Sequence, residues 1–351
     1  MNKNRLGALE VRLFSACLDN DIEEIKTILS NSQININSRD VDRSTPLQIA
    51  CKNGYIEAAK LLLSDQRIDV NDENRTSLYV VCEKGHIEIV ELLLKDERVD
   101  VNKSHTCDEQ TPFWIACCEG HLEVVRLLLS DERVDVNRAN IEDQSPFWIA
   151  YSKGHIEIVK LLFNDKRIDV NQGDEYEQTP LHLACFQEDI EIIKLFLNDD
   201  RVDVNKVDEY GWAPFHFVCW RGTIEIVNLF LERVDDHFEE KGINPTPFFV
   251  ACFYGSVEIV KYILASKRGI SLNVTNSEGK TAIDFAREGM TRKPFDIEKE
   301  FQIRIENCPK VIELLELFEN NPKETRSKLK IQLGLAGKSF FFFFDSFLFN
   351  F

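Results

Sequence analysis

A segment of about 34 residues recurs along most of this chain, and it limits the folds that the chain can adopt. The copy at residues 145–171 reads SPFWIAYSKGHIEIVKLLFNDKRIDVN. Ser145 suits an N-cap and Pro146 a first helical position, which predicts a short helix ending near Ser152. After Gly154, only a narrow polar stripe interrupts the apolar residues of 155–164 at helical spacing. The copy therefore predicts two helices.

Such a pair of short helices buries too little apolar surface to be stable alone. Ordering about 34 residues costs roughly 1.5 kcal/mol for each residue, which one antiparallel helix pair does not offset. Copies of the unit must therefore stack on one another, each covering the apolar face of the next.

The copies keep a helical block of fixed length and vary only in the link between blocks. The spacing from the opening Thr or Ser to the closing Asn is 26 residues in five copies, those that end at Asn71, Asn102, Asn137, Asn171 and Asn205. The link to the next copy is 5 residues after Asn71 and 8 or 9 after the other repeats. Since packed scaffolds forbid insertions that projecting loops tolerate, we expect the links to project.

These residues resemble the ankyrin repeat family. The resemblance rests on TPLHLA at 179–184, DEYGWAPFH at 208–216, the repeated Gly-His pairs and the repeated DVN, and it covers residues 11 to about 318. It implies an all-α solenoid of stacked helix-turn-helix units with projecting finger loops, and a non-enzymatic scaffold or adaptor that binds a protein segment in its concave groove.

The chain departs from the family pattern in two ways. Arg-Val or Arg-Ile plus one extra residue replaces the usual Gly-Ala before DVN, which accounts for the longer period. The usual His after Pro-Leu is kept as His182 and His216 but replaced elsewhere, including by Trp114 and Trp148. We expect these two tryptophans to pack inside the array, stacked on each other, and the local hydrogen bonds of the usual His to be reorganised.

We expect four regions. They are an N-terminal capping repeat at 1–37, the ankyrin repeat array at 38–294, terminal capping helices at 295–318 and a C-terminal extension at 319–351. Pro309 is expected to open the last helix of the array, and the stretch after Leu231 to loosen or bend the stack. The extension contains a short basic helix in 319–337 and is otherwise expected to be disordered or truncated.

The tail from Ser339 to Phe351 includes five consecutive Phe residues. It is too short to span a bilayer and would be prone to β-aggregation if exposed. It is either a misread gene end or a docking strip. If coding sequence continues beyond it, the chain is a fragment of a larger signalling or enzymatic protein.

The net charge and the cysteines indicate which partners and which compartment suit the protein. The net charge of −18 argues against nucleic acid and anionic membranes as partners and permits a basic protein partner, although acidity can also serve only solubility. Seven of the ten cysteines recur at one repeat position, on the order of 10 Å apart, which is beyond disulfide reach. We expect buried thiols, a reducing cytoplasmic compartment and a monomer.

The candidate binding residues follow from the resemblance, which places the groove at the ends of the first helices and on the fingers. In the first half of the chain these positions are polar. In the second half three successive copies carry aromatic residues, which form an apolar strip typical of interface anchors. Some of these rings could instead belong to the core. The partner-binding prediction comprises Tyr176, Phe186, Tyr210, Trp212, Trp220, Arg221, Phe253 and Tyr254.

Little in the sequence indicates catalysis or a cofactor. No phosphate loop, nucleophile elbow or pair of catalytic carboxylates is present. Metal-ligand residue types gather at His105, Cys107, Cys117, Cys118 and His121, but Cys117 and His121 occupy repeat positions, so we predict no metal site. A structural array without a specific ligand remains the alternative to a binding module.

Overall fold

The computed structural model describes residues 7–72, 75–233, 246–266, 272, 274–291 and 298–335. Within these ranges every regular element is a helix, as the all-α prediction requires. The chain divides into two compact units, Met1–Glu175 and Tyr176–Phe351, here called unit 1 and unit 2.

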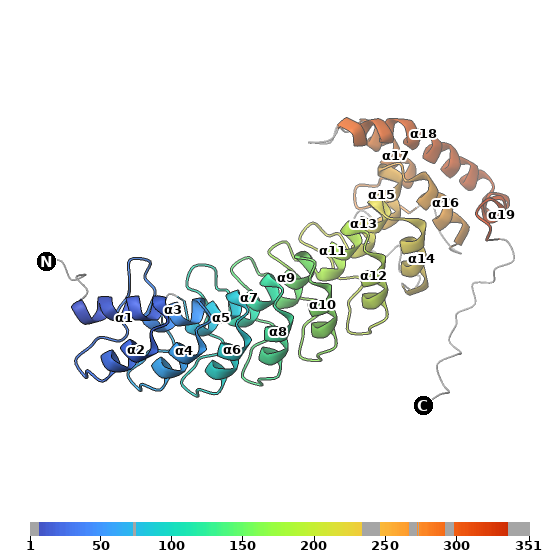
Figure 1. Cartoon of the computed structure of the whole chain (residues 1–351). Coiled ribbons are helices and arrows are strands. Elements are labelled where there is room, and N and C mark those ends of the chain that lie inside the picture. The colour runs from blue at the N-terminus through green and yellow to red at the C-terminus, as the bar shows by residue number, and fades with distance from the viewer. Residues whose placement is uncertain are drawn as a thin grey trace, which may run out of the picture. The chain divides into compact units, whose positions relative to one another are not determined.

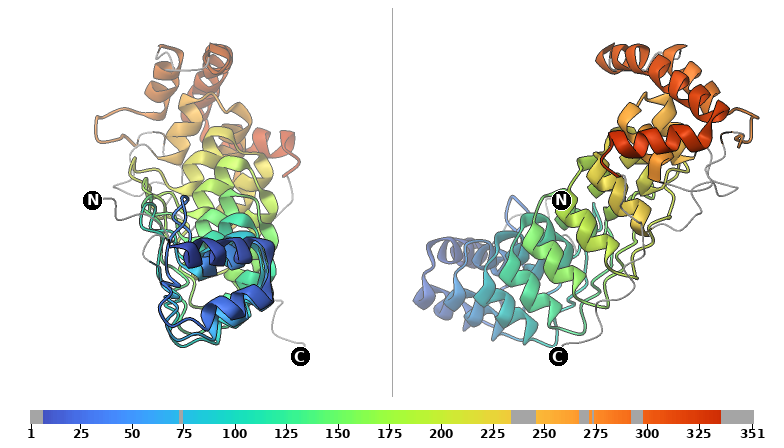
Figure 2. Two further views of the ribbon diagram at one scale, coloured as in Figure 1. Left: turned by 60° about the vertical axis from the view of Figure 1, so that its left-hand side comes forward. Right: turned by 90° about the vertical axis from the view of Figure 1, so that its right-hand side faces the viewer.

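Unit 1 consists of five helix pairs. In each pair the first helix lies in one row and the second helix in another, and the links between pairs project as loops (Figure 1; Figure 2 shows the two rows end-on). The predicted helices of residues 145–171 are confirmed as α9 and α10. The helices are α1 (Ala8–Asp19), α2 (Ile22–Leu29), α3 (Pro46–Lys52), α4 (Ile56–Leu63), α5 (Ser77–Lys84), α6 (Ile87–Leu94), α7 (Pro112–Glu119), α8 (Leu122–Leu129), α9 (Pro146–Ser152) and α10 (Ile156–Phe163).

The first helices begin where a side-chain oxygen satisfies a free backbone amide. In α3, α5, α7 and α9 the N-cap Thr or Ser accepts a hydrogen bond from the backbone N–H three residues on. These helices are buried almost throughout; Phe113 and Phe147, for example, are each 1% exposed. The Thr-Pro pattern therefore fixes both the start of each helix and its place in the core.

Histidine rings join the turns of successive pairs. Nε2 of His86, His121 and His155 donates to the carbonyl of Lys52, Glu83 and Cys118 in the preceding pair. Each ring lies against the preceding pair's glycine, at Gly54, Gly85 and Gly120, all of which have positive φ. A side chain at these glycines would collide with the imidazole, so the Gly-His pair is a packing element of the stack.

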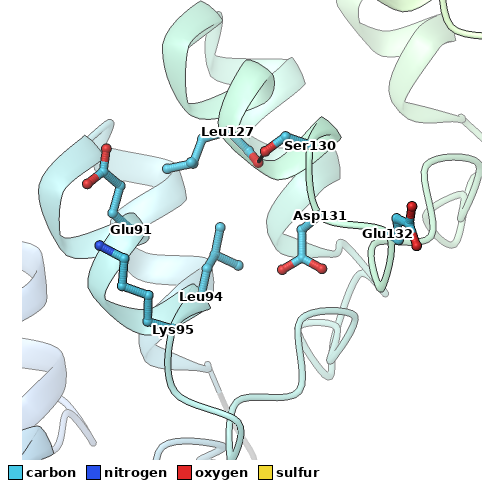
Figure 3. Close-up of a pocket in the computed structure, with 7 residues that line it drawn as sticks. All are labelled: Glu91, Leu94, Lys95, Leu127, Ser130, Asp131 and Glu132. Atoms are coloured by element: carbon cyan, nitrogen blue, oxygen red, sulfur yellow. Dashed lines mark hydrogen bonds between the residues drawn. The ribbon is translucent and has the colours of Figure 1, made fainter.

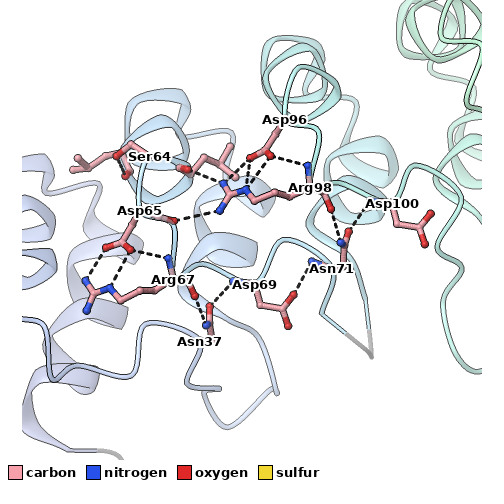
Figure 4. A network of polar contacts seen from close by, with 11 residues as sticks. Asn37, Ser64, Asp65, Arg67, Asp69, Asn71, Asp96, Arg98 and Asp100 are labelled. Carbon is pink, nitrogen blue, oxygen red and sulfur yellow. Dashed lines mark hydrogen bonds and ion pairs between the residues drawn. The ribbon is translucent and has the colours of Figure 1, made fainter.

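Asparagines of the DVN motif staple neighbouring loops together (Figure 4). Asn71 Nδ2 donates to the Arg98 carbonyl at 2.7 Å, and its Oδ1 accepts from the Asp100 amide at 2.8 Å. Asn37, Asn102 and Asn137 make the same two bonds to the next copy. Each staple satisfies two backbone groups that no helix or strand pairs.

The arginine that replaces the family's Gly-Ala caps the neighbouring helix. Arg98 makes a paired contact with Asp96 and donates to the carbonyl of Leu63, the last residue of α4, at 2.9 Å (Figure 4). Equivalent bonds run from Arg67 to Leu29, from Arg133 to Leu94 and from Arg167 to Leu129. Carbonyls at a helix C-terminus lack intrahelical partners, so the extra arginine links each repeat to the one before.

The tryptophans at the His position are buried, as predicted, but they do not stack. Trp114 and Trp148 are 3% and 9% exposed. Within the described part of unit 1, Trp114 makes no ring contact with Trp148; its indole N–H instead donates to the Gln144 carbonyl at 2.8 Å. The stacking prediction is wrong because a buried indole N–H needs an acceptor, and the next finger supplies one.

Unit 2 continues the helix pairs and ends in a longer helix. Figure 1 shows α11, α13, α15 and α17 in one row and α12, α14 and α16 in another. The helices are α11 (Pro180–Gln187), α12 (Ile190–Leu197), α13 (Pro214–Arg221), α14 (Ile224–Arg233), α15 (Pro247–Phe253), α16 (Val257–Ser266), α17 (Ala282–Thr291), α18 (Glu298–Asn320) and α19 (Pro322–Gln332).

Pro309 does not open the last helix of the array, as the sequence analysis expected. It lies inside α18, which begins at Glu298. The helix continues through the proline because both flanks are anchored: Arg304 and Cys308 are buried before it, and Val311 and Leu315 after it. Burial of these side chains offsets the one backbone hydrogen bond that proline removes.

Helix α19 occupies part of the region assigned to the C-terminal extension. It packs on α16 and α18, with Leu329 buried and Arg326 Nε donating to the Leu264 carbonyl at 3.0 Å. Most of the segment expected to loosen or bend the stack, residues 234–245, lies outside the described residues, as does the Phe-rich tail. Among the described helices, none is both long and apolar enough to cross a membrane.

Candidate functional site

The predicted binding residues all belong to unit 2 and all reach the surface to some degree. Tyr176, Phe186 and Tyr210 are 43%, 41% and 64% exposed. Arg221 is exposed, while Trp212, Trp220, Phe253 and Tyr254 are half-buried. None of the eight belongs to the fully buried core.

Three rings form a continuous series across successive first helices. Phe186 lies near the end of α11, Trp220 near the end of α13, and Tyr254 is the C-cap residue of α15. The Phe186 and Trp220 centroids are 6.0 Å apart, and those of Trp220 and Tyr254 are 5.3 Å apart. Both spacings are those of favourable aromatic pairs. We call Phe186, Trp220 and Tyr254, together with the neighbouring Trp212, the aromatic row.

The ring of Phe217, a residue that the sequence analysis missed, packs against the row. Phe217 is 9% exposed, and its ring lies 6.1 Å from Phe186, 5.3 Å from Trp212 and 6.5 Å from Trp220. The signal was present, because Phe217 replaces the aliphatic residue found at Ile115 and Ile149. Since its neighbours hold the ring on several sides, Phe217 fixes the spacing of the row.

The finger of residues 208–212 places Trp212 and Tyr210. Asp208, which is 3% exposed, accepts from the backbone amides of Tyr210 at 3.0 Å and Trp212 at 2.8 Å. Gly211 has φ +77°, which allows the chain to turn between them. A hydrogen bond with Glu209 raises the pKa of Tyr210 to about 12.

Two arginines lie over the rings. The Arg221 guanidinium is 5.3 Å from the Phe186 ring centroid and 5.4 Å from that of Trp220. The Arg304 guanidinium, from α18, is 5.1 Å from the Phe253 centroid and 5.6 Å from that of Tyr254. Cation–π contacts of this kind hold a guanidinium in a defined place while leaving its edge available.

Helix α18 closes one end of the aromatic row. Arg304 is 3% exposed, and Cys308 Sγ lies 3.5 Å from the Phe253 carbonyl. Gly289 allows this approach, since a Cβ there would lie 3.1 Å from the Cys308 sulfur. The insertion that interrupts the last repeat therefore ends in a helix that covers part of Phe253 and Tyr254, whereas Phe186 at the other end of the row is 41% exposed.

The corresponding positions in unit 1 are polar. Where unit 2 has Phe186 and Trp220, unit 1 has Lys52, Glu83, Cys118 and Ser152. A hollow of about 410 Å³ lies instead between the second helices α6 and α8 (Figure 3). Leu94 and Leu127 line it together with Glu91, Lys95 and Asp131, and it is wide open to solvent. It lacks the enclosed shape of a ligand site.

The candidate metal residues do not come together. His105 is 8% exposed and stacks on Tyr79 at 5.6 Å, Cys117 is buried, and Cys107 is exposed. Across the described ranges, no three His, Cys, Asp or Glu side chains are grouped as metal ligands would be. All ten cysteines are free thiols, and burial raises the pKa of Cys51 to about 12, which makes it a poor nucleophile.

Comparison with known proteins agrees with the helix pairs, the fingers and the Gly-His turns. The family model described as ankyrin repeats (3 copies) matches residues 13–105, 97–174, 166–241 and 215–291. No curated protein matches the chain. The matched segments together span residues 13–291, well over half of the sequence, and the chain belongs to the ankyrin repeat family.

Proposed function

We propose that this protein is a non-enzymatic interaction module, a scaffold or adaptor whose unit 2 holds a segment of a partner protein along the aromatic row. Ankyrin repeats are in general protein-interaction modules, which supports the broad class. The observation that carries the specific proposal is the row itself: Phe186, Trp220 and Tyr254 lie in contact in successive repeats and remain partly exposed. Clustered aromatic side chains are typical of binding hot spots.

The rigidity of the row favours binding. Phe217 and the Asp208-organised finger hold the rings before any partner arrives, so their association costs little side-chain entropy. Tyr176 and Tyr210 on the fingers and Arg221 at the helix end extend the proposed site, and Phe253 and Tyr254 form its α18 end. The remaining binding energy comes from apolar contact with the half-exposed ring faces.

We also propose that the protein works in a reducing compartment, the cytoplasm. The ten free cysteines, most of them buried, support this localisation. We further propose the regions expected from the sequence: the α1–α2 pair covers one end of unit 1 as a capping repeat, and α18 closes the array of unit 2.

Affinity capture with the full-length chain tests the proposed site. The test variant is F186A/W220A, and the matched control is K52A/S152A, which removes side chains at equivalent positions of unit 1. We expect partners retained by the wild type and the control to be lost by the test variant, while all three chains melt alike. The same captured proteins from all three chains would contradict binding at the aromatic row.

A further inference from the structure

Arg221 differs from most described arginines because it contacts rings and, among the described residues, no carboxylate. Arg12, Arg39, Arg75, Arg126, Arg233 and Arg287 each make an ion pair, and so do the five repeat arginines such as Arg98. Within the described residues, Arg221 makes only its two ring contacts. The chain has 60 acidic and 42 basic residues, so a shortage of carboxylates does not explain this.

The two rings hold the Arg221 guanidinium in place. They come from successive repeats, Phe186 from α11 and Trp220 from α13, and Phe217 supports both. Ring contacts use the face of the guanidinium and leave its N–H edge free. That edge carries donors in a planar fork that matches a carboxylate in two parallel hydrogen bonds. Arg221 is therefore pre-positioned for an anion beside an apolar surface.

A carboxylate fits this place better than a phosphate group. Sites that select phosphorylated peptides use clusters of arginines, whereas the other arginine at the row, Arg304, is 3% exposed under α18. The chain also carries a net charge of −18, which disfavours a dianion more than a monoanion. The single positive charge of the exposed Arg221 therefore suits a carboxylate, which carries one negative charge.

We propose that Arg221 binds an Asp or Glu side chain of the partner segment, with an apolar residue next to that acid packing on Phe186 and Trp220. The inference rests on the proposed function and specifies its partner class. It gives the row a polar anchor, which fixes the register of the bound segment, since an apolar strip alone permits sliding.

A random 12-residue peptide library, displayed on phage and selected against the full-length chain, supplies probes without a known partner. We expect selected peptides to share an Asp or Glu adjacent to an aromatic or aliphatic residue. Synthetic versions are then titrated against wild type, R221Q, W220A and the control R43Q, which removes an exposed finger arginine of unit 1. Each peptide is also made with its acid changed to the amide.

The proposal predicts at least a tenfold loss of affinity for R221Q and for the amide peptide, no further loss when the two changes are combined, and no loss for R43Q. Affinity unchanged by R221Q but lost with W220A would overturn the carboxylate assignment and leave the aromatic row standing. Affinity unchanged by both variants would remove the row as well. Selection of basic peptides, matching the acidic Glu177 and Glu209 of the fingers, or of no peptide at all, would also contradict the proposal.

Discussion

Units 1 and 2 are built from the same helix pair but differ in the residue types at equivalent positions of their repeats. In unit 1 the loop positions repeat closely: an Asn staple and an Arg cap recur from copy to copy. In unit 2 aromatic residues replace the polar residues at the first-helix ends. The comparison teaches that positions facing a neighbouring repeat keep the stack together, whereas the first-helix ends vary in character from one unit to the other.

The largest expected contrast concerns a buried histidine of unit 2. His182 Nδ1 accepts from the Thr179 amide and Nε2 donates to the Trp212 carbonyl, each at 3.0 Å, and burial lowers its pKa to about 4. The folded state thus binds fewer protons than the unfolded state, so stability is full above the unfolded pKa of about 6.5 and is lost as pH falls towards 4. The expected loss is on the order of 3 kcal/mol.

Unit 1 has Gln48 at the equivalent position, and it makes both kinds of bond without titrating. H182Q should therefore keep the bonds and flatten the stability curve between pH 6.5 and 4. Urea unfolding followed by tryptophan fluorescence measures this, with Trp212 and Trp220 reporting unit 2 in a variant whose unit 1 tryptophans, Trp114 and Trp148, are changed to Phe. Equal pH slopes for the wild type and H182Q would show that His182 does not cause the loss.

The next contrast compares two glycines of unit 1, at which an added side chain would cause backbone strain alone or strain together with a steric collision. Gly120 and Gly154 have φ +80° and +78°, but a Cβ at Gly120 would lie 2.5 Å from His155, whereas at Gly154 nothing lies within 4 Å. We expect G154A to cost about 1 kcal/mol for strain. G120A should cost about 1–3 kcal/mol more because the His155 ring must move. Equal losses of unfolding free energy in the two variants would contradict the packing role of the Gly-His pair.

A smaller effect is expected for the asparagine staples, and it distinguishes the two units. N71A removes two bonds to the next copy and should cost about 1–2 kcal/mol. Within the described residues, the Asn205 side chain makes no such staple, and the sequence after Leu231, ERVDDHFEEK, lacks DVN. N205A should therefore stay within about 0.5 kcal/mol of wild type, as measured by chemical unfolding. A comparable cost for N205A would contradict the end of the staple series.

The smallest expected effect concerns only the rates at which the cysteine thiols react. In the native protein Cys107 is exposed and Cys118 half-buried, while the other eight thiols are buried. We expect a thiol reagent at neutral pH to modify Cys107 first, Cys118 slowly and the others only on unfolding, with no change in stability. Rapid native modification of Cys51 or Cys82 would indicate that the stacks open more readily than their packing suggests.

Much of the fold was predictable from the sequence because its signals are local and repeated. The N-cap Thr or Ser, the following Pro and the Gly-His turn each set a helix boundary by short-range geometry. Long-range contacts were not predictable. Helix α18 runs through Pro309 because burial on both sides stabilises it, and Trp114 bonds to a carbonyl 30 residues away.

The candidate site was predictable only in part, for the same reason. Repeat position identified Phe186 and Trp220 as neighbours, since equivalent residues of stacked copies lie side by side. In the next copy the equivalent residue is Phe253, but the ring that contacts Trp220 is that of Tyr254, one residue later. Repeat position could not show that Phe217 supports them, that Arg304 covers Phe253 and Tyr254, or that Arg221 makes no ion pair with the described acidic residues. These facts depend on side-chain directions and on an insertion that has no counterpart in the other repeats.

Hydrogen exchange on the full-length chain, with and without a selected peptide, tests the central claim most directly. Binding along the aromatic row predicts slowed exchange in the finger and helix-end segments of unit 2, around residues 176–188 and 208–222, with unit 1 unchanged. Protection confined to unit 1, or to the second helices α12, α14 and α16, would contradict the account.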